Sequence, residues 1–421
     1  MKLSDIAEFI TDKISSSSIS LDNYVTTDSL LQNKRGRELA QNLPPMQCAL
    51  TNYKKGDVLV ANIRPYLKKV WFADSEGGCS SDVLVFRAKN EHYPSFLYAI
   101  LMQDAFFDYA MLGAKGSKMP RGDKNQIMRY ELPTFTSAEE ENIGNIMVDV
   151  ISKINVNRQI NDNLEAMAKQ LYDYWFVQFD FPNEEGKPYK SSGGAMVWNE
   201  KLKREIPSCF EVDNMGNLCN FRNGINYSKD EIGNDYQIVN VRNISSSRIL
   251  LDGEDFDVIT VPTSKAENYV LKPDDIIIAR SGCPGSTRLL LLPANTLFCG
   301  FIICCSPHNS SMRNYLTYCL KQLEGTNATT SGGSILQNVS QDTLKGLQII
   351  VPEKEIIDKF NKTIEFIFAR MLNCLKESKT LTKQRDELLP LLMNGQASVN
   401  YHLSAFICFT IPLQIHFFII I

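Results

Sequence analysis

Two short apolar runs in the chain are flanked by similar polar residues. One lies in KGDVLVANIR (55–64) and the other in PDDIIIARSG (273–282), and the aspartates before them, Asp57 and Asp275, stand 218 positions apart. A short continuous apolar run between turn signals is typical of a buried strand. The sequence therefore predicts two buried strands, each followed by a loop that begins with polar residues.

The similarity extends along both halves of the chain. Each strand is followed by a helix-like segment, then a loop rich in glycine and polar residues, then a strand that ends in proline. These segments are 94–101, 113–124 and 129–135 in the first half and 313–320, 329–337 and 347–353 in the second. Because an internal repeat indicates copies of one structural unit, we predict an α/β (α+β) protein with two similar globular domains and a pseudo-two-fold internal repeat.

Each half closes with a long amphipathic segment. Mostly apolar positions spaced alternately by four and three run from Ile143 to Trp175 and from Phe360 to Leu392, and the two series align at an offset of 217. Heptads sustained over four or more repeats are typical of a coiled coil. We therefore predict a pair of long antiparallel helices, with separate amphipathic helices on two globular cores as the alternative.

The midpoint of each series is polar or small. Asn157 and Asn161 occupy the middle of the first series, and Cys374 and Ser378 occupy the middle of the second. In an antiparallel pair these midpoints would face each other. A polar layer of this kind lowers stability but fixes register and orientation, so we predict that these four residues align the two helices.

Composition divides the chain into six segments. The stretch 179–196, FDFPNEEGKPYKSSGGAM, is rich in proline, glycine and serine, as is usual for a linker. The predicted segments are a first globular domain (1–136), a first long helix (137–180), a hinge linker (181–196), a second globular domain (197–352), a second long helix (353–396) and an apolar C-terminal tail (397–421).

The tail and the cysteines bear on location. Residues 403–421, LSAFICFTIPLQIHFFIII, reach the length of a membrane span, but they contain a proline and lack flanking lysine or arginine. We expect a non-native extension and no membrane partner, with a tail-anchored coiled-coil interaction protein as the alternative. The odd count of eleven cysteines and the absence of a secretory pattern at the N-terminus predict reduced thiols in a cytoplasmic protein.

Catalytic motifs are missing from the sequence. It contains no GxxxxGK[ST], GxGxxG or GxSxG, and its cysteines form no CxxC pair that would suggest a metal site. Asp180 with Glu185 and Lys187 imitates the Asp…Glu-x-Lys set of metal-dependent nucleases. A stand-alone magnesium-dependent nuclease is therefore an alternative to a non-catalytic binding protein.

Two similar units on a rigid spacer suit a target that presents two sites, and double-stranded DNA is such a target. The net charge of −4 leaves any basic surface local. Arginine can read guanine, asparagine can read adenine, and lysine more often contacts phosphate. An ordinary solvated side chain is the alternative for each candidate. The candidate DNA-binding residues are Asn62, Arg64, Tyr66, Lys68, Lys69, Lys118, Arg121, Arg242, Arg280, Ser281, Gly282 and Arg288.

Several segments resemble the specificity (S) subunits of type I restriction–modification enzymes. LEAMAKQLYDYWFVQFDFP (164–182) and RDELLPLLMNGQASV (385–399) are similar to segments of that family, and KGDVLVANIRPYLKK (55–69) and LKPDDIIIARSG (271–282) resemble the strand and loop of its target-recognition domains. The resemblance covers about residues 1–397, and the chain departs from the family pattern after about residue 399.

The resemblance implies a function. It implies a non-catalytic subunit whose two target-recognition domains each read half of an asymmetric, bipartite DNA site, while the two helices set the spacing. It further implies that the helices dock two modification (methyltransferase) subunits, which restriction (endonuclease/translocase) subunits join. S-adenosylmethionine, ATP and magnesium would then belong to the partner subunits, and this chain would bind no cofactor.

Overall fold

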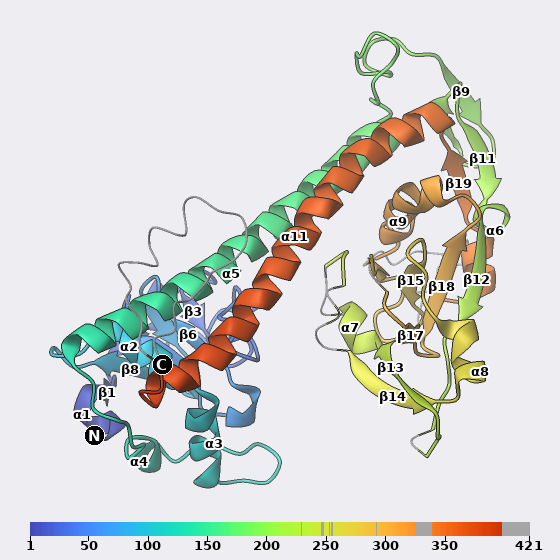
Figure 1. Cartoon of the computed structure of the whole chain (residues 1–421). Helices are drawn as coiled ribbons and strands as arrows, with labels where there is room; N and C mark the ends of the chain where they lie inside the picture. The colour runs from blue at the N-terminus through green and yellow to red at the C-terminus, as the bar shows by residue number, and fades with distance from the viewer. Residues whose placement is uncertain are drawn as a thin grey trace. The chain divides into compact units, whose positions relative to one another are not determined.

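The computed structural model describes residues 1–228, 230–245, 248–251, 253, 256–291, 293–324 and 339–397. The chain divides into two compact units (Figure 1). The first unit comprises residues 1–156 together with the chain from Glu377 onward, and the second comprises residues 157–376. Except for Ala397, the predicted apolar tail lies outside the described residues.

The first unit contains two four-stranded sheets. In one, the order is β1-β8-β5-β6 and all neighbours are antiparallel: β1 (Ala7–Phe9), β8 (Val83–Ala88), β5 (Val58–Ala61) and β6 (Val70–Phe72). In the other, the order is β2-β4-β7-β3 and β3 runs parallel to β7: β2 (Lys13–Ser15), β4 (Ala49–Tyr53), β7 (Gly77–Cys79) and β3 (Tyr24–Val25). All four residues of β5 are buried, as its apolar run predicts.

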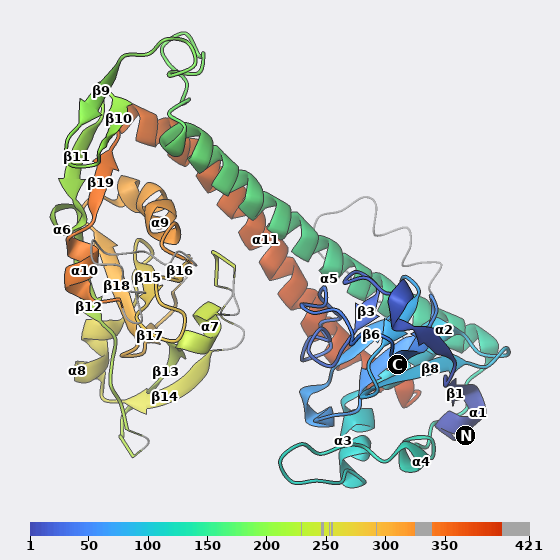
Figure 2. The same ribbon diagram turned by 180° about the vertical axis from the view of Figure 1, so that it is seen from behind.

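Short helices complete the first unit. They are α1 (Leu3–Ile6), α2 (Pro94–Leu101), α3 (Asp104–Leu112) and α4 (Lys124–Ile127). The α2 sequence, PSFLYAIL, begins with a proline, whose fixed φ angle suits the first turn of a helix. This helix packs against β5, β6 and β8 (Figure 2).

The second unit repeats the first sheet and adds others. Its four-stranded sheet has the order β12-β18-β15-β16: β12 (Cys219–Asn223), β18 (Ile302–Pro307), β15 (Ile276–Ala279) and β16 (Thr287–Leu289). A three-stranded sheet has the order β14-β13-β17: β14 (Asp257–Val261), β13 (Asn234–Val239) and β17 (Thr296–Phe298). Two further sheets have two strands each. One pairs β9 (Met196–Asn199) with β10 (Arg204–Pro207), and the other pairs β11 (Glu211–Asn214) with β19 (Gln348–Val351). The short helices are α6 (Met215–Leu218), α7 (Val241–Ser245), α8 (Thr263–Ala266), α9 (Arg313–Lys321) and α10 (Gln341–Lys345).

The central strands of the two sheets have matching neighbours. Strand β5 lies between β8 and β6, and Ala61 pairs with Val83. Strand β15 lies between β18 and β16, and Ala279 pairs with Ile302. Residues that follow the two strands therefore occupy equivalent places in the two units.

The strand predicted within 129–135 is not formed as such. Glu131 makes a single antiparallel bridge with Lys2, whereas β19 pairs with β11 over four residues in the second unit. In the first unit the partner segment is cut short because α1 starts at Leu3. Pro133 also lacks the N–H group that a longer ladder would need.

A buried carboxylate precedes each central strand. Asp57 accepts two hydrogen bonds of 2.7 Å from Nε and Nη2 of Arg87. Asp275 accepts one of 2.6 Å from Nη2 of Arg222 and one of 2.5 Å from the hydroxyl of Ser306. Both aspartates are almost fully buried, and a buried charge is tolerated only when it is paired and hydrogen-bonded.

Two long helices contribute to both units. Helix α5 spans Ser137–Tyr172 and continues as a π-helical turn through Val177, and α11 spans Lys354–Met393. In the first unit, Met147 of α5 shares a core with Leu388 of α11, while Lys153 pairs with Glu377 at 3.5 Å. A later residue of α5 thus meets an earlier residue of α11, so the two helices are antiparallel in this unit.

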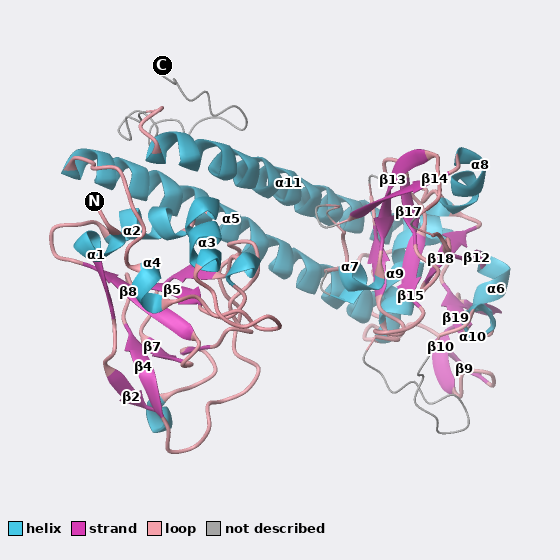
Figure 3. Cartoon of the chain, turned by 90° about the horizontal axis from the view of Figure 1, so that it is seen from below, coloured by secondary structure: helices cyan, strands magenta, loops and turns pink. Residues whose placement is uncertain are grey.

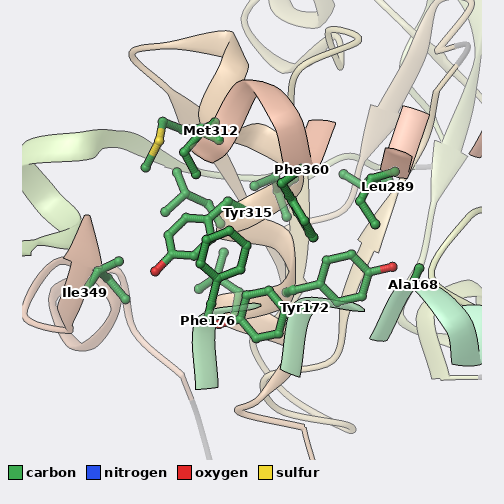
Figure 4. Packing of buried hydrophobic residues seen from close by; sticks show 14 of the residues in the cluster. Ala168, Tyr172, Phe176, Leu289, Met312, Tyr315, Ile349 and Phe360 are labelled. Atoms are coloured by element: carbon green, nitrogen blue, oxygen red, sulfur yellow. The ribbon is translucent and has the colours of Figure 1, made fainter. Parts of the chain in front are cut away.

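In the second unit the same helices meet through aromatic side chains. Tyr172, Trp175 and Phe176 surround Phe360 of α11, with ring centroids 6.5, 5.9 and 5.0 Å from its ring. Tyr315 of α9 joins this cluster, 4.7 Å from Phe176 (Figure 4). Aromatic groups bury large areas each, so this cluster anchors the ends of both helices to the second unit.

The positions of the predicted heptad series face inward. Every position of both series, from Ile143 to Trp175 and from Phe360 to Leu392, is buried or half-buried. Pro390 lies in the last turn of α11. Figure 3 shows both long helices in cyan. Among the described residues, no helix combines the length and apolar character needed to cross a bilayer.

The ion pair below β15 gives a stability prediction. Replacing Asp275 by alanine leaves the half-buried Arg222 guanidinium without its carboxylate, so we expect the free energy of unfolding to fall by about 3–5 kcal/mol. Urea unfolding measures this change. The matched control is Asp274→Ala, because Asp274 is half exposed and lies 3.9 Å from Arg313. The control should change stability by less than about 0.5 kcal/mol, and equal effects of the two variants would contradict the prediction.

Candidate nucleic-acid interface

The first candidate loop starts at Asn62, directly after β5. Its N–H donates to the carbonyl of Asp82 at 2.8 Å, and its own carbonyl accepts from Gly122 N–H at 3.2 Å. The Asn62 side chain is only 8% exposed, and its Oδ1 has no hydrogen-bond partner among the described residues. The backbone of Asn62 therefore ties the loop to two other segments.

The rest of the loop turns sharply. Arg64 and Lys68 have φ angles of 52° and 50°, and they flank a short 3-10 turn at Pro65–Leu67. Left-handed backbone is costly for residues other than glycine, so surrounding contacts must hold it. One such contact is the 2.7 Å hydrogen bond from Arg64 N–H to the carbonyl of Pro120. The turn leaves the Tyr66 side chain 49% exposed.

The two lysines of this loop are held by the protein itself. Nζ of Lys68 lies 3.0 Å from Oδ1 of Asp104, and Nζ of Lys69 donates to the carbonyl of Thr27. Burial lowers the pKa of Lys69. Neither ammonium is displayed as a free phosphate-binding group in this structure.

A charged network joins this loop to the end of α11. Buried Lys34 pairs with Asp104 at 2.8 Å and with Asp386 at 3.0 Å. Arg385 also pairs with Asp386, at 2.8 Å. Burial alone would raise the pKa of Asp104, but the hydrogen bonds from Lys34 and Lys68 hold that pKa below its usual value. The network fixes α3, which begins at Asp104, against α11.

The second loop of the first unit forms a small hairpin. The N–H and carbonyl groups of Lys115 and Arg121 exchange two hydrogen bonds of 2.9 Å. Nε of Arg121 lies 3.0 Å from Oδ1 of Asp82, so this hairpin rests beside the loop that begins at Asn62. Lys118, at the tip, is exposed and has no partner among the described residues.

The second unit has an equivalent corner after β15. Arg280 N–H donates to the carbonyl of Phe301 at 2.9 Å, and its carbonyl accepts from Val339 N–H at 3.0 Å. These bonds repeat those of Asn62 in the first unit. The Arg280 side chain is exposed, and no described residue forms an ion pair or hydrogen bond with it.

The loop requires glycine at position 282, two residues after Arg280. Gly282 has φ of 79°, and a Cβ atom there would lie 3.0 Å from Cγ1 of Val241. This close approach places α7 beside the loop. Ser281, which lies between Arg280 and Gly282, is half-buried. Arg242 of α7 is exposed and forms an ion pair with Asp257.

Arg288 does not fit a surface role. Only 6% of it is exposed, and its Nη1 pairs with Glu324, which also accepts from Thr287 N–H at 2.6 Å. The guanidinium does not face solvent, and all three residues of its strand, β16, are buried. We therefore leave Arg288 out of the candidate interface and assign it to the internal polar structure.

Sequence reasoning missed two residues at these corners. Asp82 and Phe301 precede β8 and β18, and their carbonyls accept the hydrogen bonds from Asn62 and Arg280. Aligning DVLVFRA (82–88) with FIICCSP (301–307) would have placed them in one position of the repeat. A residue at the start of a strand carries no motif of its own, so the sequence gives no direct signal for either of them.

The residues that imitate a nuclease motif have other partners. Asp180 accepts hydrogen bonds from the N–H and hydroxyl of Ser191, at 2.7 and 2.6 Å. Lys187 pairs with Glu185 at 2.9 Å on the surface. Among the described residues, no cluster of three or more histidine, cysteine, aspartate or glutamate side chains could hold a metal ion.

The four predicted helix-pairing residues differ in burial. Asn157, Asn161 and Cys374 are almost fully buried within the second unit, and Oδ1 of Asn161 has no hydrogen-bond partner among the described residues. Ser378 belongs to the first unit and is half-buried. A buried amide is costly unless it is satisfied, so the unpartnered Oδ1 of Asn161 lowers the stability of the second unit.

Comparisons with known proteins agree on one family. The family described as "Type I restriction modification DNA specificity domain" matches residues 1–166 and 207–385. The type I restriction enzyme MjaIX specificity subunit of Methanocaldococcus jannaschii is 23% identical over 84% of this chain and 80% of its own length. The HindI specificity subunit of Haemophilus influenzae is 24% identical over 89% of this chain and 94% of its own.

A solved structure shares the fold. The crystal structure of the type I restriction-modification S subunit from M. genitalium superposes with a TM-score of 0.51 at 17% identity. The match covers 93% of this chain and 95% of that one.

Arg280 and Arg288 give contrasting stability predictions. Arg288→Ala should lower the free energy of unfolding by about 1–3 kcal/mol because it removes the buried guanidinium that pairs with Glu324. Arg280→Ala should change it by less than about 0.5 kcal/mol because that side chain is exposed. Thermal unfolding of both variants tests this, and a larger loss for Arg280→Ala would show that the two assignments are reversed.

Proposed function

Because the chain belongs to the type I restriction modification DNA specificity family, we propose that it reads an asymmetric, bipartite site on double-stranded DNA. Each of the two units supplies one target-recognition domain, within residues 1–136 and 197–352. The chain itself performs no catalysis and binds no cofactor in this proposal. S-adenosylmethionine, ATP and magnesium belong to its partner subunits, and the complex works in the cytoplasm.

The observation that carries the proposal is one corner built twice with different side chains. A backbone N–H after the central strand donates to the residue before the neighbouring strand in both units, at 2.8 and 2.9 Å. The first unit places Asn62, Asp82 and Arg121 at this corner, and the second places Arg280 and Phe301. A constant scaffold with different displayed groups suits two domains that read different short sequences.

We assign the interface residues by exposure and partners. Tyr66, Lys118, Arg121, Arg242, Arg280, Ser281 and Gly282 are the proposed DNA-contacting set, with Asn62 and Arg64 shaping the first loop. Lys68 and Lys69 position that loop through Asp104 and Thr27. Paired arginines on such loops can exchange a carboxylate for phosphate or guanine when DNA arrives.

The long helices supply the spacer in this proposal. Segments 137–180 and 353–396 form an antiparallel coiled coil that sets the distance between half-sites, and 181–196 is the hinge linker. Asn157, Asn161, Cys374 and Ser378 fix its register. The outer faces of the helices dock two modification (methyltransferase) subunits, to which restriction subunits bind.

Arg280 provides the test of base reading. Replacing it with alanine should weaken binding of the assembled methyltransferase complex to its recognition site by roughly 1–3 kcal/mol and affect nonspecific DNA less. Methylome sequencing of the source strain, with and without this gene, identifies the site, and fluorescence anisotropy measures the affinity.

Lys201→Ala is the matched control, because Lys201 is exposed in the same unit but lies on the turn between β9 and β10. It should leave the affinity for the site unchanged. If Arg280→Ala weakened all sequences equally, Arg280 would be a phosphate contact and not a base reader.

The spacer role makes a separate prediction. Inserting one heptad at the midpoints of both α5 and α11 lengthens each helix by roughly 10 Å, which corresponds to about three base pairs. The methylated motif of the variant should therefore accept a spacer longer by about three base pairs. The same insertion in the 181–196 linker should leave the motif unchanged, and an unaltered motif after the helix insertions would refute the spacer role.

A further inference from the structure

We propose that Phe301 is a specificity-determining residue that contacts the 5-methyl group of a thymine in the half-site read by the second unit. This inference rests on the proposed function and names one base of its target. Phe301 is 64% exposed, at the turn between β17 and β18. Single exposed apolar residues are common on proteins, so the argument depends on how this one is displayed.

The turn that carries Phe301 is fixed by backbone hydrogen bonds on both sides. Cys299 N–H donates to the carbonyl of Val239 at 3.0 Å, and Gly300 N–H donates to that of Ile225 at 2.9 Å. Ile302 N–H closes the turn on Cys299 at 2.9 Å. The phenyl ring therefore projects from a rigid support, which reduces the entropy lost when it contacts a ligand.

Glycine before Phe301 permits this geometry. A Cβ atom at position 300 would lie 2.3 Å from Oδ1 of Asn226, so no larger residue fits without moving that side chain. The same chain segment, 224–226, is thus packed under the turn. A side chain at residue 300 would have to displace that of Asn226, whereas residue 301 exposes a large apolar side chain.

Phe301 stands beside the proposed guanine reader. Its carbonyl accepts the 2.9 Å hydrogen bond from Arg280 N–H, at the ends of neighbouring antiparallel strands β15 and β18. Cross-strand neighbours hold their Cβ atoms roughly 4.5–5.5 Å apart. Adjacent base pairs are about 3.4 Å apart, so two such side chains can reach neighbouring base pairs in one groove.

The first unit places a different group at the equivalent position. Asp82 accepts the corresponding backbone hydrogen bond, and its carboxylate binds Arg121. The shared hydrogen bond is accepted by a backbone carbonyl, so it leaves the side chain at this position free to differ between the units. A carboxylate in one and an exposed phenyl ring in the other are expected of residues that distinguish two half-sites.

The chemistry of the groove selects the ligand. Thymine C5-methyl is the apolar group that an unmodified base pair presents in the major groove, and phenylalanine is one of the side chains that contact it. Arg280 can donate two hydrogen bonds to the O6 and N7 atoms of guanine. The geometry therefore assigns a guanine and a nearby thymine to the second half-site.

The test removes the methyl group from the DNA and the ring from the protein. The complex of the full chain with its modification subunits is titrated with duplexes that carry the methylated motif. Thymines of the second half-site are replaced one at a time by deoxyuridine. At one position the wild-type affinity should fall roughly 4- to 10-fold, whereas Phe301→Ala should bind the thymine duplex more weakly and show no further loss with deoxyuridine.

Two variants serve as controls. Phe301→Leu keeps an apolar side chain and should retain sensitivity to deoxyuridine. Val258→Ala removes another exposed apolar residue of the same unit, on β14, and should behave as wild type. Co-purification of every variant with the modification subunits establishes that the complex is assembled.

Three results would overturn the inference. One is equal deoxyuridine sensitivity in wild type and Phe301→Ala, which would place the methyl contact elsewhere. Another is a loss of affinity in Phe301→Ala with no deoxyuridine effect at any position, which would make the ring a wedge between base steps. A third is loss of the modification subunits from Phe301→Ala, which would make the ring a protein contact. A wild-type complex that fails to prefer the motif over a scrambled duplex would instead refute the proposed function itself.

Discussion

Each candidate interface depends on a four-residue strand whose two ends are fixed inside its unit. At one end a buried aspartate, Asp57 or Asp275, is satisfied by an arginine. At the other end a backbone hydrogen bond joins the first loop residue to the neighbouring strand. An unpaired charge at that depth would cost several kcal/mol, so strand, ion pair and loop form together. The side chains at the loop tips can differ between the two units because both units support the loop in the same way, with a buried aspartate–arginine pair and a backbone hydrogen bond.

The balance of charges around the loops decides which groups face solvent. In the first unit, Lys68 and Lys69 follow the central strand but bind Asp104 and Thr27. In the second unit, Arg280 is exposed at the corresponding corner, and no described residue forms an ion pair with it. Exposed cations therefore lie at the hairpin tip in one unit and at the strand end in the other. The two interfaces use one scaffold with different distributions of positive charge.

Much of the secondary structure follows from the amino-acid pattern. The apolar runs at 58–61 and 276–279 form strands, PSFLYAIL forms α2, and the long amphipathic segments form α5 and α11. The resemblance to type I specificity subunits is confirmed by the family match. The side-chain environment was harder to predict, because Arg280 and Arg288 look alike in sequence and differ only in tertiary burial. The sequence likewise predicts Asn62 and Lys68 as DNA contacts, because their interactions with Gly122 and Asp104 depend on segments distant in the chain.

The composition of the first unit affects the order in which the protein folds. Its core takes Ile143 and Met147 from the early part of the chain and Leu388 and Leu392 from the end. The 220 residues of the second unit are translated between these two parts. At roughly 5–20 residues per second the ribosome needs about 10–45 s for that stretch. The unit encoded first is therefore completed last, and its nascent apolar surface awaits α11 while the second unit is still being synthesised.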